Sequence, residues 1–336
     1  MVRHLYKEGF PQRPQLDISG SHFILACALG LSACTPSFAS ASQVTDLRIL
    51  GVQAEPPEQL FDATCTNPSD LTTCTVTQVD DTTITLLYAD PVHPDTPGVV
   101  TPLLCAPSTT NPLCGAGSLA LSQETGPQPT FSFDLGGALG PGALQQVPAL
   151  LLASVQSSQL HGYGGIQVEL QLGVDTGDAN GVQLASKTLV FNPRLPDGNP
   201  NRNHNPGITG MKLIDFQGND LGVLPPGQLL ELTVGIEVGL RPVLAAGSIE
   251  TYTTVDLSGQ TETVTEQLSY DFYSTTGADF DNGTASEPLP GVADPPLGLS
   301  RITASQAGSG TMWTVVHDGR GGDAWIQIPW KASGGN

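Results

Sequence analysis

Basic side chains are scarce in this chain of 336 residues. Lys and Arg together number 12, against 32 Asp and Glu, and the formal net charge at pH 7 is −20. Residues 1–33 hold three of the basic and two of the acidic residues, so the chain from Cys34 onward has 9 basic against 30 acidic residues. Nucleic acids and anionic lipid head groups both require a basic footprint. The charge balance therefore argues against nucleic acids and anionic lipids as direct partners. We interpret the acidity as a source of charge repulsion that keeps neighbouring molecules apart.

Long apolar segments are missing as well. The run Phe23–Ala33 has eleven residues, whereas a transmembrane helix needs about 20. A buried core helix is disfavoured because the run lies near the N-terminus and is followed by a Thr/Ser/Pro/Ala-rich stretch. A short apolar core in this position is typical of a signal peptide.

The sequence Leu31-Ser32-Ala33-Cys34 closes this run and resembles a bacterial lipobox. In proteins of that kind, the Cys thiol is acylated and the chain is cut just before it. The resemblance implies that residues 1–33 are a lipoprotein signal peptide, that 34–43 form a tether, and that Cys34 is the lipidation site. The alternative is cleavage after Ala39-Ser40-Ala41, an A-x-A site that would yield a free secreted protein.

Cysteines are few, and their number is even after the predicted signal is removed. Cys27 lies in the signal and Cys34 takes the lipid. The remaining four predict two disulfides in an exported chain, and they are Cys65, Cys74, Cys105 and Cys114. Three pairings are possible. We favour local pairing within each C-x8-C segment, because Pro and Asn in each loop favour a turn back. That spacing does not fit a zinc site.

Helix-forming stretches are rare, while the chain has 39 Gly and 28 Pro. This composition is typical of many short strands joined by tight turns. Apolar and polar residues alternate over 166–174 and over 230–238, which predicts strands with one buried and one exposed face. One stretch, about 144–157, favours a helix, which we expect to begin after Pro148. The predicted fold class is therefore all-β, with antiparallel sheets packed as sandwiches.

The best candidate for a domain boundary is the polar run 192–206, which contains four prolines and has the composition of a linker. We predict a first β-sandwich domain over 44–195, containing the disulfides and the short helix. A linker over 196–204, a second immunoglobulin-like domain over 205–331 and a tail over 332–336 follow. A faint repeat, PPEQL at 56–60 and PPGQL at 225–229, agrees with this tandem arrangement.

Two segments resemble a known group of proteins. VTDLRILGVQAEPP at 44–57 follows the lipobox directly, and WTVVHDGRGGDAW at 313–325 is similar to a terminal hairpin. The chain thereby resembles uncharacterised lipoproteins of Gram-negative bacteria with immunoglobulin-like or PKD-like domains. The resemblance implies tandem immunoglobulin-like antiparallel β-sandwiches attached to the cell envelope, at the outer membrane. It implies no chemistry.

Catalytic motifs are absent from the sequence. A hydrolase needs a nucleophile, a base and an orienting acid, and no G-x-S-x-G, H-E-x-x-H, P-loop or Rossmann pattern occurs. His93, His161 and His204 fall in predicted loops, and His317 is expected to cap a hairpin beside Asp318. We therefore predict no catalytic residue and no enzyme. An exported hydrolase with an unrecognised site is the alternative.

The acidic segment 279–283, Asp-Phe-Asp-Asn-Gly, has some features of a calcium loop. Its oxygen-bearing side chains precede a Gly, as in the first half of such a loop, but the complete ligand pattern does not fit. We interpret it as an Asp/Asn/Gly turn and predict no cofactor and no metal. Calcium remains the weaker alternative, with Asp279, Asp281 and Asn282 as ligands and either Asp256 or Asp318 as a further one.

Three tryptophans fall in the last predicted hairpin. Trp313 is expected to face the core. Trp325 and Trp330 lie an odd number of residues apart in the last predicted strand, so their side chains point to opposite faces. At least one of them could therefore be exposed and contact a glycan or a protein. The predicted function is a lipid-anchored envelope protein acting as a binding or structural module. Its expected partners are the membrane, through the anchor, and an envelope protein or glycan. A calcium-rigidified adhesion-type module is a further alternative.

Overall fold

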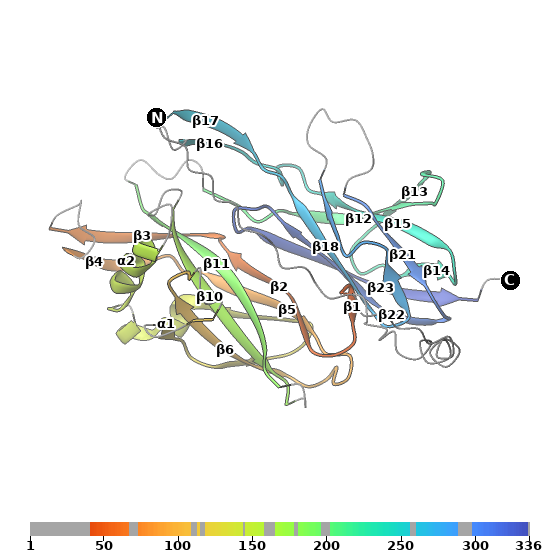
Figure 1. Ribbon diagram of the computed structural model, residues 1–336, viewed down its shortest axis with the longest axis horizontal. Helices are drawn as coiled ribbons and strands as arrows, with labels where there is room; N and C mark the ends of the chain where they lie inside the picture. The colour runs from red at the N-terminus through yellow and green to blue at the C-terminus, as the bar shows by residue number, and fades with distance from the viewer. Residues whose placement is uncertain are drawn as a thin grey trace, which may run out of the picture. The chain divides into compact units, whose positions relative to one another are not determined.

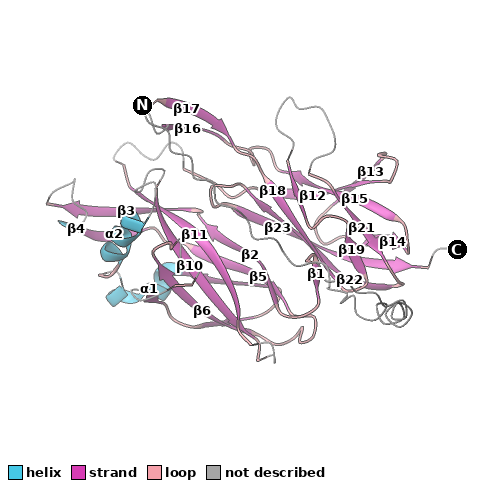
Figure 2. Ribbon diagram, in the orientation of Figure 1, coloured by secondary structure: helices cyan, strands magenta, loops and turns pink. Residues whose placement is uncertain are grey.

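The computed structural model describes residues 41–66, 73–108, 113–114, 118–143, 145–157, 165–177, 181–195, 202–255, 260–287 and 298–334. Cys27, Cys34, His161 and Asp256, together with the predicted signal peptide, lie outside these ranges. Figures 1 and 2 show strands along almost the whole described chain, with helices confined to one segment. The all-β class predicted from the sequence is confirmed.

The first sandwich packs a three-stranded sheet against a larger one. The smaller sheet has the order β2 (Arg48–Glu55), β5 (Thr83–Ala89), β9 (Thr130–Asp134). The larger sheet has the order β4 (Cys74–Val79), β3 (Glu58–Cys65), β11 (Gln183–Pro193), β10 (Ile166–Asp175), β6 (Gly98–Cys105), β7 (Leu119–Ala120), with β8 (Glu124–Gly126) also on β6. Inward-facing side chains of both sheets, such as Leu86 and Leu170, form one buried core.

Two helices close part of the first sandwich. α2 (Val147–Ser157) matches the predicted helix but begins one residue before Pro148, a position near the start of a helix where proline is tolerated. Leu150 and Leu151 on α2 are buried in the first core. The sequence did not predict α1 (Leu135–Ala143), because its Gly and Pro content disfavours a helix. Packing of buried residues such as Leu139 against the same core accompanies its formation.

The second sandwich is also built from two sheets. One has the order β1 (Gln43–Val44), β18 (Ser269–Thr275), β22 (Gly308–His317), β23 (Asp323–Ser333), β14 (Leu230–Thr233), with β20 (Thr284–Ser286) also on β18. The other has the order β13 (Asp220–Leu224), β12 (Ile208–Ile214), β15 (Glu237–Leu244), β21 (Ser300–Ala304), β19 (Ala278–Phe280). A separate hairpin pairs β16 (Thr251–Val255) with β17 (Thr261–Thr265).

The alternation over 230–238 does not form one strand. The chain forms β14, turns through Val234–Ile236, and continues as β15 in the opposite sheet. Gly235 has a φ of 77°, a conformation that glycine adopts without the steric cost of a side chain. The period-2 pattern continues through this turn, which is why the sequence could not separate the two strands.

Most strand neighbours are antiparallel, as predicted, but three described pairs are parallel: β1 with β18, β3 with β11, and β14 with β23. The first of these decides how the chain enters the fold. Residues 43–44 pair with Ser274 and Thr275 of the second sandwich, and only then does the chain build the first sandwich. The N-terminal end of the described chain is therefore held by the second sandwich.

A third apolar cluster joins the two sandwiches. Leu50 of β2 and Leu87 of β5 lie in this cluster with Trp313 and Val315 of β22. A Cβ at Gly51 would lie 3.4 Å from Trp325, which shows how closely β2 approaches β23. Two sheets from different sandwiches thus pack face to face. Trp313 is buried, as expected, and the cluster in which it lies is the one between the sandwiches.

Candidate functional site

The hairpin loop between β22 and β23, residues 318–322, lies at the centre of a polar cluster that includes side chains from both sandwiches. Asp318 closes the loop by accepting hydrogen bonds from the N–H groups of Arg320 (2.7 Å) and Gly322 (2.8 Å) on one carboxylate oxygen. Gly319 and Gly321 have φ values of 79° and 101°. The sequence Asp-Gly-Arg-Gly-Gly thus supplies a cap and two left-handed positions, and the resulting tight loop projects Arg320.

Arg320 binds three carboxylates drawn from both sandwiches. Its guanidinium lies 3.2 Å from Glu58 of β3, 3.3 Å from Glu250 and 3.1 Å from Glu266, and it stacks over the ring of Tyr252 at 4.0 Å. Burial raises the pKa of Glu266, although hydrogen bonds from the Glu250 N–H and Arg320 act in the opposite direction. Arginine suits this position because its planar fork can satisfy several carboxylates at once.

A second set of charges crosses the junction beside the loop. Lys187 of β11 in the first sandwich forms an ion pair with Asp323 at the start of β23, and both side chains are buried, 8% and 9% exposed. The Lys187 ammonium also donates to the Gly321 carbonyl at 2.6 Å. The other oxygen of Asp323 lies 2.6 Å from Nδ1 of His317, whose Nε2 lies 3.2 Å from Asp271.

His317 is a cation at neutral pH. Burial by itself lowers the pKa of the imidazole, but hydrogen bonds and charge interactions with Asp271 and Asp323 outweigh this and raise the pKa to about 9. The set therefore contains two cations and two carboxylates in an alternating chain, Lys187, Asp323, His317 and Asp271. Within it, the buried pair of Lys187 and Asp323 tolerates the loss of one member poorly, because a buried charge then loses a partner.

The last residues of the polar run 192–206 are held at the same junction. The Asn203 side chain is buried and donates to Asp318 at 2.7 Å. Asn205 donates to the Ala54 carbonyl at 2.7 Å and accepts the Asp323 N–H at 2.9 Å. The Arg202 guanidinium lies 2.9 Å from Asp80. Part of this polar segment therefore contributes to the contact between the two sandwiches.

The junction is suited to holding the sandwiches together rather than to proton transfer. A general base needs a free lone pair within reach of the proton it removes. Carboxylates occupy both ring nitrogens of His317, so this side chain has none to offer. Two further histidines each have one ring nitrogen beside a carboxylate: His93 Nδ1 lies 3.2 Å from the buried Asp90, and His204 Nδ1 lies 2.7 Å from Glu250.

The predicted weak metal ligands serve the loop between β19 and β20. One oxygen of Asp281 accepts hydrogen bonds from the N–H of Arg301 at 2.8 Å, the hydroxyl of Ser300 at 3.1 Å and the N–H of Asn282 at 2.7 Å. Asp279 accepts the hydroxyl of Ser42 at 2.8 Å. The loop is thus closed by protein donors.

Asp318 lies at the junction in a different network, with its second oxygen bound to Asn203. Within the ranges that the structure describes, no group of three or more His, Cys, Asp or Glu side chains is arranged to hold a metal ion.

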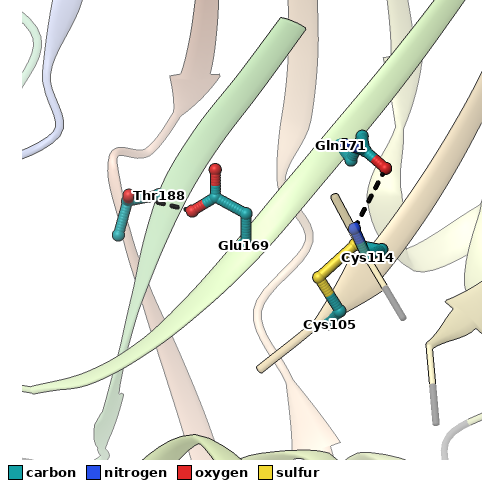
Figure 3. Close-up of a disulfide and its surroundings, with 5 residues drawn as sticks. All are labelled: Cys105, Cys114, Glu169, Gln171 and Thr188. Atoms are coloured by element: carbon teal, nitrogen blue, oxygen red, sulfur yellow. Dashed lines mark hydrogen bonds between the residues drawn. A yellow bond between two sulfur atoms is a disulfide. The ribbon is translucent and has the colours of Figure 1, made fainter. Parts of the chain in front are cut away.

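One of the predicted local disulfides is present: Cys105 and Cys114 are joined, with a Cα–Cα distance of 5.5 Å. Figure 3 shows the Cys114 N–H directed at the Gln171 side chain of β10, at 3.2 Å. Thr188 of β11 donates to Glu169 nearby, at 3.2 Å. The disulfide therefore fastens residues after β6 to the end of that strand, and the Cys114 N–H holds them beside β10.

The other local pair remains a prediction. Cys65 and Cys74 are directly opposite one another in the β3–β4 register, as local pairing requires. Their side chains lie outside what the structure describes, and so does Cys34. Among the described helices, none is both long and apolar enough to cross a membrane.

Sequence reasoning missed Lys187, Asp271 and Asp323. A weak signal existed, because Lys187 falls at the inward parity of a strand whose neighbours Ala185 and Leu189 pack on the first core. A basic residue in such a position needs a partner. The partner is the first residue of a strand 136 residues later in the chain, which no local pattern reveals.

No protein-family model matches the chain, and no curated protein matches it. Distant likenesses occur among solved structures. Red sea bream transglutaminase shares 11% identity over 87% of this chain and 32% of its own, with a TM-score of 0.21. The fibronectin(III)-like modules of CbhA from Clostridium thermocellum share 7% identity over 86% of this chain and 94% of their own, with a TM-score of 0.19. A bacterial ice-binding adhesin shares 13% identity over 83% of this chain and 65% of its own, with a TM-score of 0.17.

The chain spans about a third of the length of the transglutaminase. Similarity at this level carries no information on activity or partners, and the expected lipoprotein group stays a prediction. The sheets themselves establish the tandem β-sandwich architecture.

Proposed function

We propose that the protein is a lipid-anchored cell-envelope protein whose two sandwiches act as a single rigid binding or structural module. One observation carries the proposal, namely the closed charge network between the sandwiches at Lys187, Asp323 and Arg320. Domains of one chain move relative to one another by default, unless their interface is large and apolar. Here the apolar cluster around Trp313 adds packing to the buried charges.

Rigidity follows from the cost of separating the sandwiches. Opening the junction would break the pairs of Lys187 with Asp323 and of Arg320 with Glu58, and hydrogen bonds to charged groups contribute about 1.5–3 kcal/mol each. It would also expose Leu50, Leu87 and other side chains of the apolar cluster to water. A module of this kind can hold a partner at a fixed distance and orientation from its anchor.

Export and anchoring are supported by two independent features. The Cys105–Cys114 disulfide is of a kind that persists in oxidising compartments outside the cytoplasm. The lipobox-like segment ending at Cys34 supplies the acylation site. The proposed partners are the membrane, reached through this lipid, and an envelope protein or glycan bound by the module.

Anchoring is tested by expressing the full chain in a Gram-negative host with a labelled fatty acid. The wild-type chain should incorporate the label and enter the membrane fraction, whereas Cys34→Ser should do neither. Cys27→Ser is the matched control and should behave as the wild type, because Cys27 lies in the predicted signal. An unlabelled mature chain beginning at Ser42 would contradict the anchor and support simple secretion.

Rigidity is tested by measuring distances between spin labels on unnatural side chains at Val182 and Ile236, which are exposed positions of the first and second sandwich. The wild-type chain should give one narrow distribution. Lys187→Met should broaden it, whereas Lys331→Met, at an exposed position of β23, should not. A broad distribution in the wild type would refute the rigid module while leaving the anchor untouched.

A further inference from the structure

The β12–β13 hairpin carries an exposed apolar group that the proposed function does not yet use. Phe216, Leu221 and Val223, here called the hairpin patch, are 66%, 55% and 55% exposed. Phe216 has the largest exposed fraction among the large apolar side chains of the described residues. Leu224 on the same strand is buried, opposite Met211 of β12. Leu221 and Val223 therefore point away from the core.

The turn holds Phe216 in place. The Asp215 carboxylate accepts the N–H groups of Gln217 at 2.9 Å and Asn219 at 2.7 Å, and its other oxygen accepts the Asn219 side-chain amide at 2.7 Å. Gly218 supplies the left-handed position, with a φ of 89°. Phe216 is thus presented by a braced turn, and a preorganised apolar group binds at a lower entropic cost than a mobile one.

The tether joins the same sandwich. The Ser274 N–H donates to the Ser42 carbonyl at 2.8 Å, and the Ser42 hydroxyl donates to Asp279 of β19 at 2.8 Å. Arg48 donates to the Gln43 carbonyl at 3.4 Å and stacks on Tyr273 at 5.1 Å. Ala41 follows Cys34 by seven residues, and a chain of that length spans about 25 Å at most.

The hairpin patch lies within reach of whatever surface holds the lipid. β19, which holds Ser42, and β12 belong to one sheet, in the order β12, β15, β21, β19. Three strand intervals of about 4.8 Å place β12 about 15 Å from β19. An acyl chain on Cys34 would therefore keep this sheet close to the bilayer.

We propose that the hairpin patch docks on the lipid surface and fixes the orientation of the module there. This inference rests on the proposed anchoring at Cys34. A lipid on Cys34 attaches the chain to the membrane but does not by itself select the sandwich that faces it. An exposed apolar group on the sandwich that carries the tether makes that selection.

The charges around the patch are compatible with a zwitterionic lipid surface. Three basic side chains lie across neighbouring strands of this sheet, with Lys212 opposite Arg241 and Arg301 opposite Gly239. Each has an acidic partner: Asp220 at 2.8 Å for Lys212, Glu237 at 3.9 Å for Arg301, and Glu287 for Arg241. These three pairs are each neutral in a chain of net charge −20, and Asp215 in the turn is the acidic side chain next to Phe216.

The test uses the full lipidated chain in phosphatidylethanolamine vesicles whose acyl chains are brominated, since bromine quenches nearby tryptophan. Phe216→Trp is compared with Val182→Trp, an exposed position of the first sandwich, and the wild-type chain gives the background of the native tryptophans. The added emission of Trp at 216 should shift to the blue and be quenched, whereas that of Trp at 182 should do neither. Mass spectrometry establishes acylation of Cys34 in each sample.

The possible outcomes separate the two proposals. Quenching at 216 and not at 182 supports docking. An unquenched Trp at 216 in an acylated chain overturns docking and leaves the anchor standing. A blue shift that does not depend on the brominated lipid has the same consequence, and it would indicate a protein partner or a second copy of the chain. Absence of the acyl chain overturns both. In the unlipidated Cys34→Ser chain, Phe216→Ser with Leu221→Ser should lower vesicle binding on the order of tenfold to a hundredfold, and no change would also overturn docking.

Discussion

Lys187 and Asp323 form a buried ion pair that joins an inward-facing position of the first sandwich to the start of the last strand of the second. The two residues are 136 positions apart, and each has a further partner across or beside the junction: the Gly321 carbonyl for Lys187 and the His317 ring for Asp323. Their pairing makes the stability of one sandwich depend on the other.

Lys187→Met should lower the stability of the whole chain. The substitution removes one of the two cationic partners of the buried Asp323 and leaves only His317; truncating one member of a buried pair costs up to about 3–5 kcal/mol. Lys331→Met, on the exposed side of β23, should change stability by less than about 0.5 kcal/mol. Urea unfolding followed by circular dichroism measures both. Equal effects of the two substitutions would show that the ion pair contributes nothing specific.

The pH dependence of stability should carry the signature of His317. Its pKa is raised from 6.5 to about 9 by Asp271 and Asp323 against the opposing effect of burial. A raised folded-state pKa stabilises the protonated form, so the contribution is complete below pH 6.5 and is lost as the pH rises through about 9. The ring is one-third exposed, and solvent screening reduces the contribution to about 1–2 kcal/mol.

The charged groups facing His317 are Asp271 of β18 and Asp323 of β23, with Lys187 of β11 beyond the latter. Melting temperatures recorded between pH 6 and pH 10 measure the effect. His317→Gln should remove the decline over this window while leaving Asp323 paired with Lys187. A variant curve parallel to that of the wild type would assign the decline to another group.

The fold was largely predictable from local patterns, and the junction was not. Alternation over 166–174 correctly predicts β10, whose residues Leu170 and Leu172 face the first core. The same alternation fails at Gly235, where the pattern persists through a turn. Lys187 and Asp323 belong to strands that local periodicity treats as independent, so only the packing of the two sandwiches brings them together.

The predicted turn at Asp281 illustrates a different limit. Its sequence favours a turn without specifying the partners of the carboxylate, and these come from Ser300 and Arg301 on β21. Strand pairing between β19 and β21 brings the two segments together. Long-range hydrogen bonds of this kind depend on register, which the sequence does not express locally.

The Cys105–Cys114 disulfide should stabilise the first sandwich. It closes a loop with a sequence separation of 9, and restricting the unfolded chain in this way contributes about 2–3 kcal/mol. Cys105→Ser with Cys114→Ser should therefore lower the melting temperature of the chain. Alkylation before reduction should label neither cysteine in the wild-type chain. Stoichiometric labelling of Cys105 or Cys114 would show that the bond does not form.

Calcium at millimolar concentration should leave the melting temperature unchanged. Asp281 already accepts three hydrogen bonds from the protein, and a ligand at 100 times its dissociation constant would raise stability by about 2.7 kcal/mol. Asp281→Ala should instead destabilise the calcium-free chain by about 1–3 kcal/mol, because the Arg301 N–H and the Ser300 hydroxyl lose their acceptor. A calcium-dependent rise that disappears in Asp281→Ala would establish a metal site.

Arg320→Lys should weaken the junction although it keeps the charge. The guanidinium reaches Glu58, Glu250 and Glu266 together and stacks on Tyr252, whereas a lysine ammonium is a point charge that cannot reproduce this fork. We expect a loss of about 1.5–3 kcal/mol, the range for hydrogen bonds to charged groups. Arg301→Lys is the matched control, because its pair with Glu237 is exposed and 3.9 Å long, and such pairs contribute about 0–1 kcal/mol. Thermal melting compares the two, and Arg320→Lys should also broaden the distance distribution between the sandwiches. A melting temperature in Arg320→Lys equal to that of Arg301→Lys would mean that charge alone, rather than the geometry of the guanidinium, holds the three carboxylates.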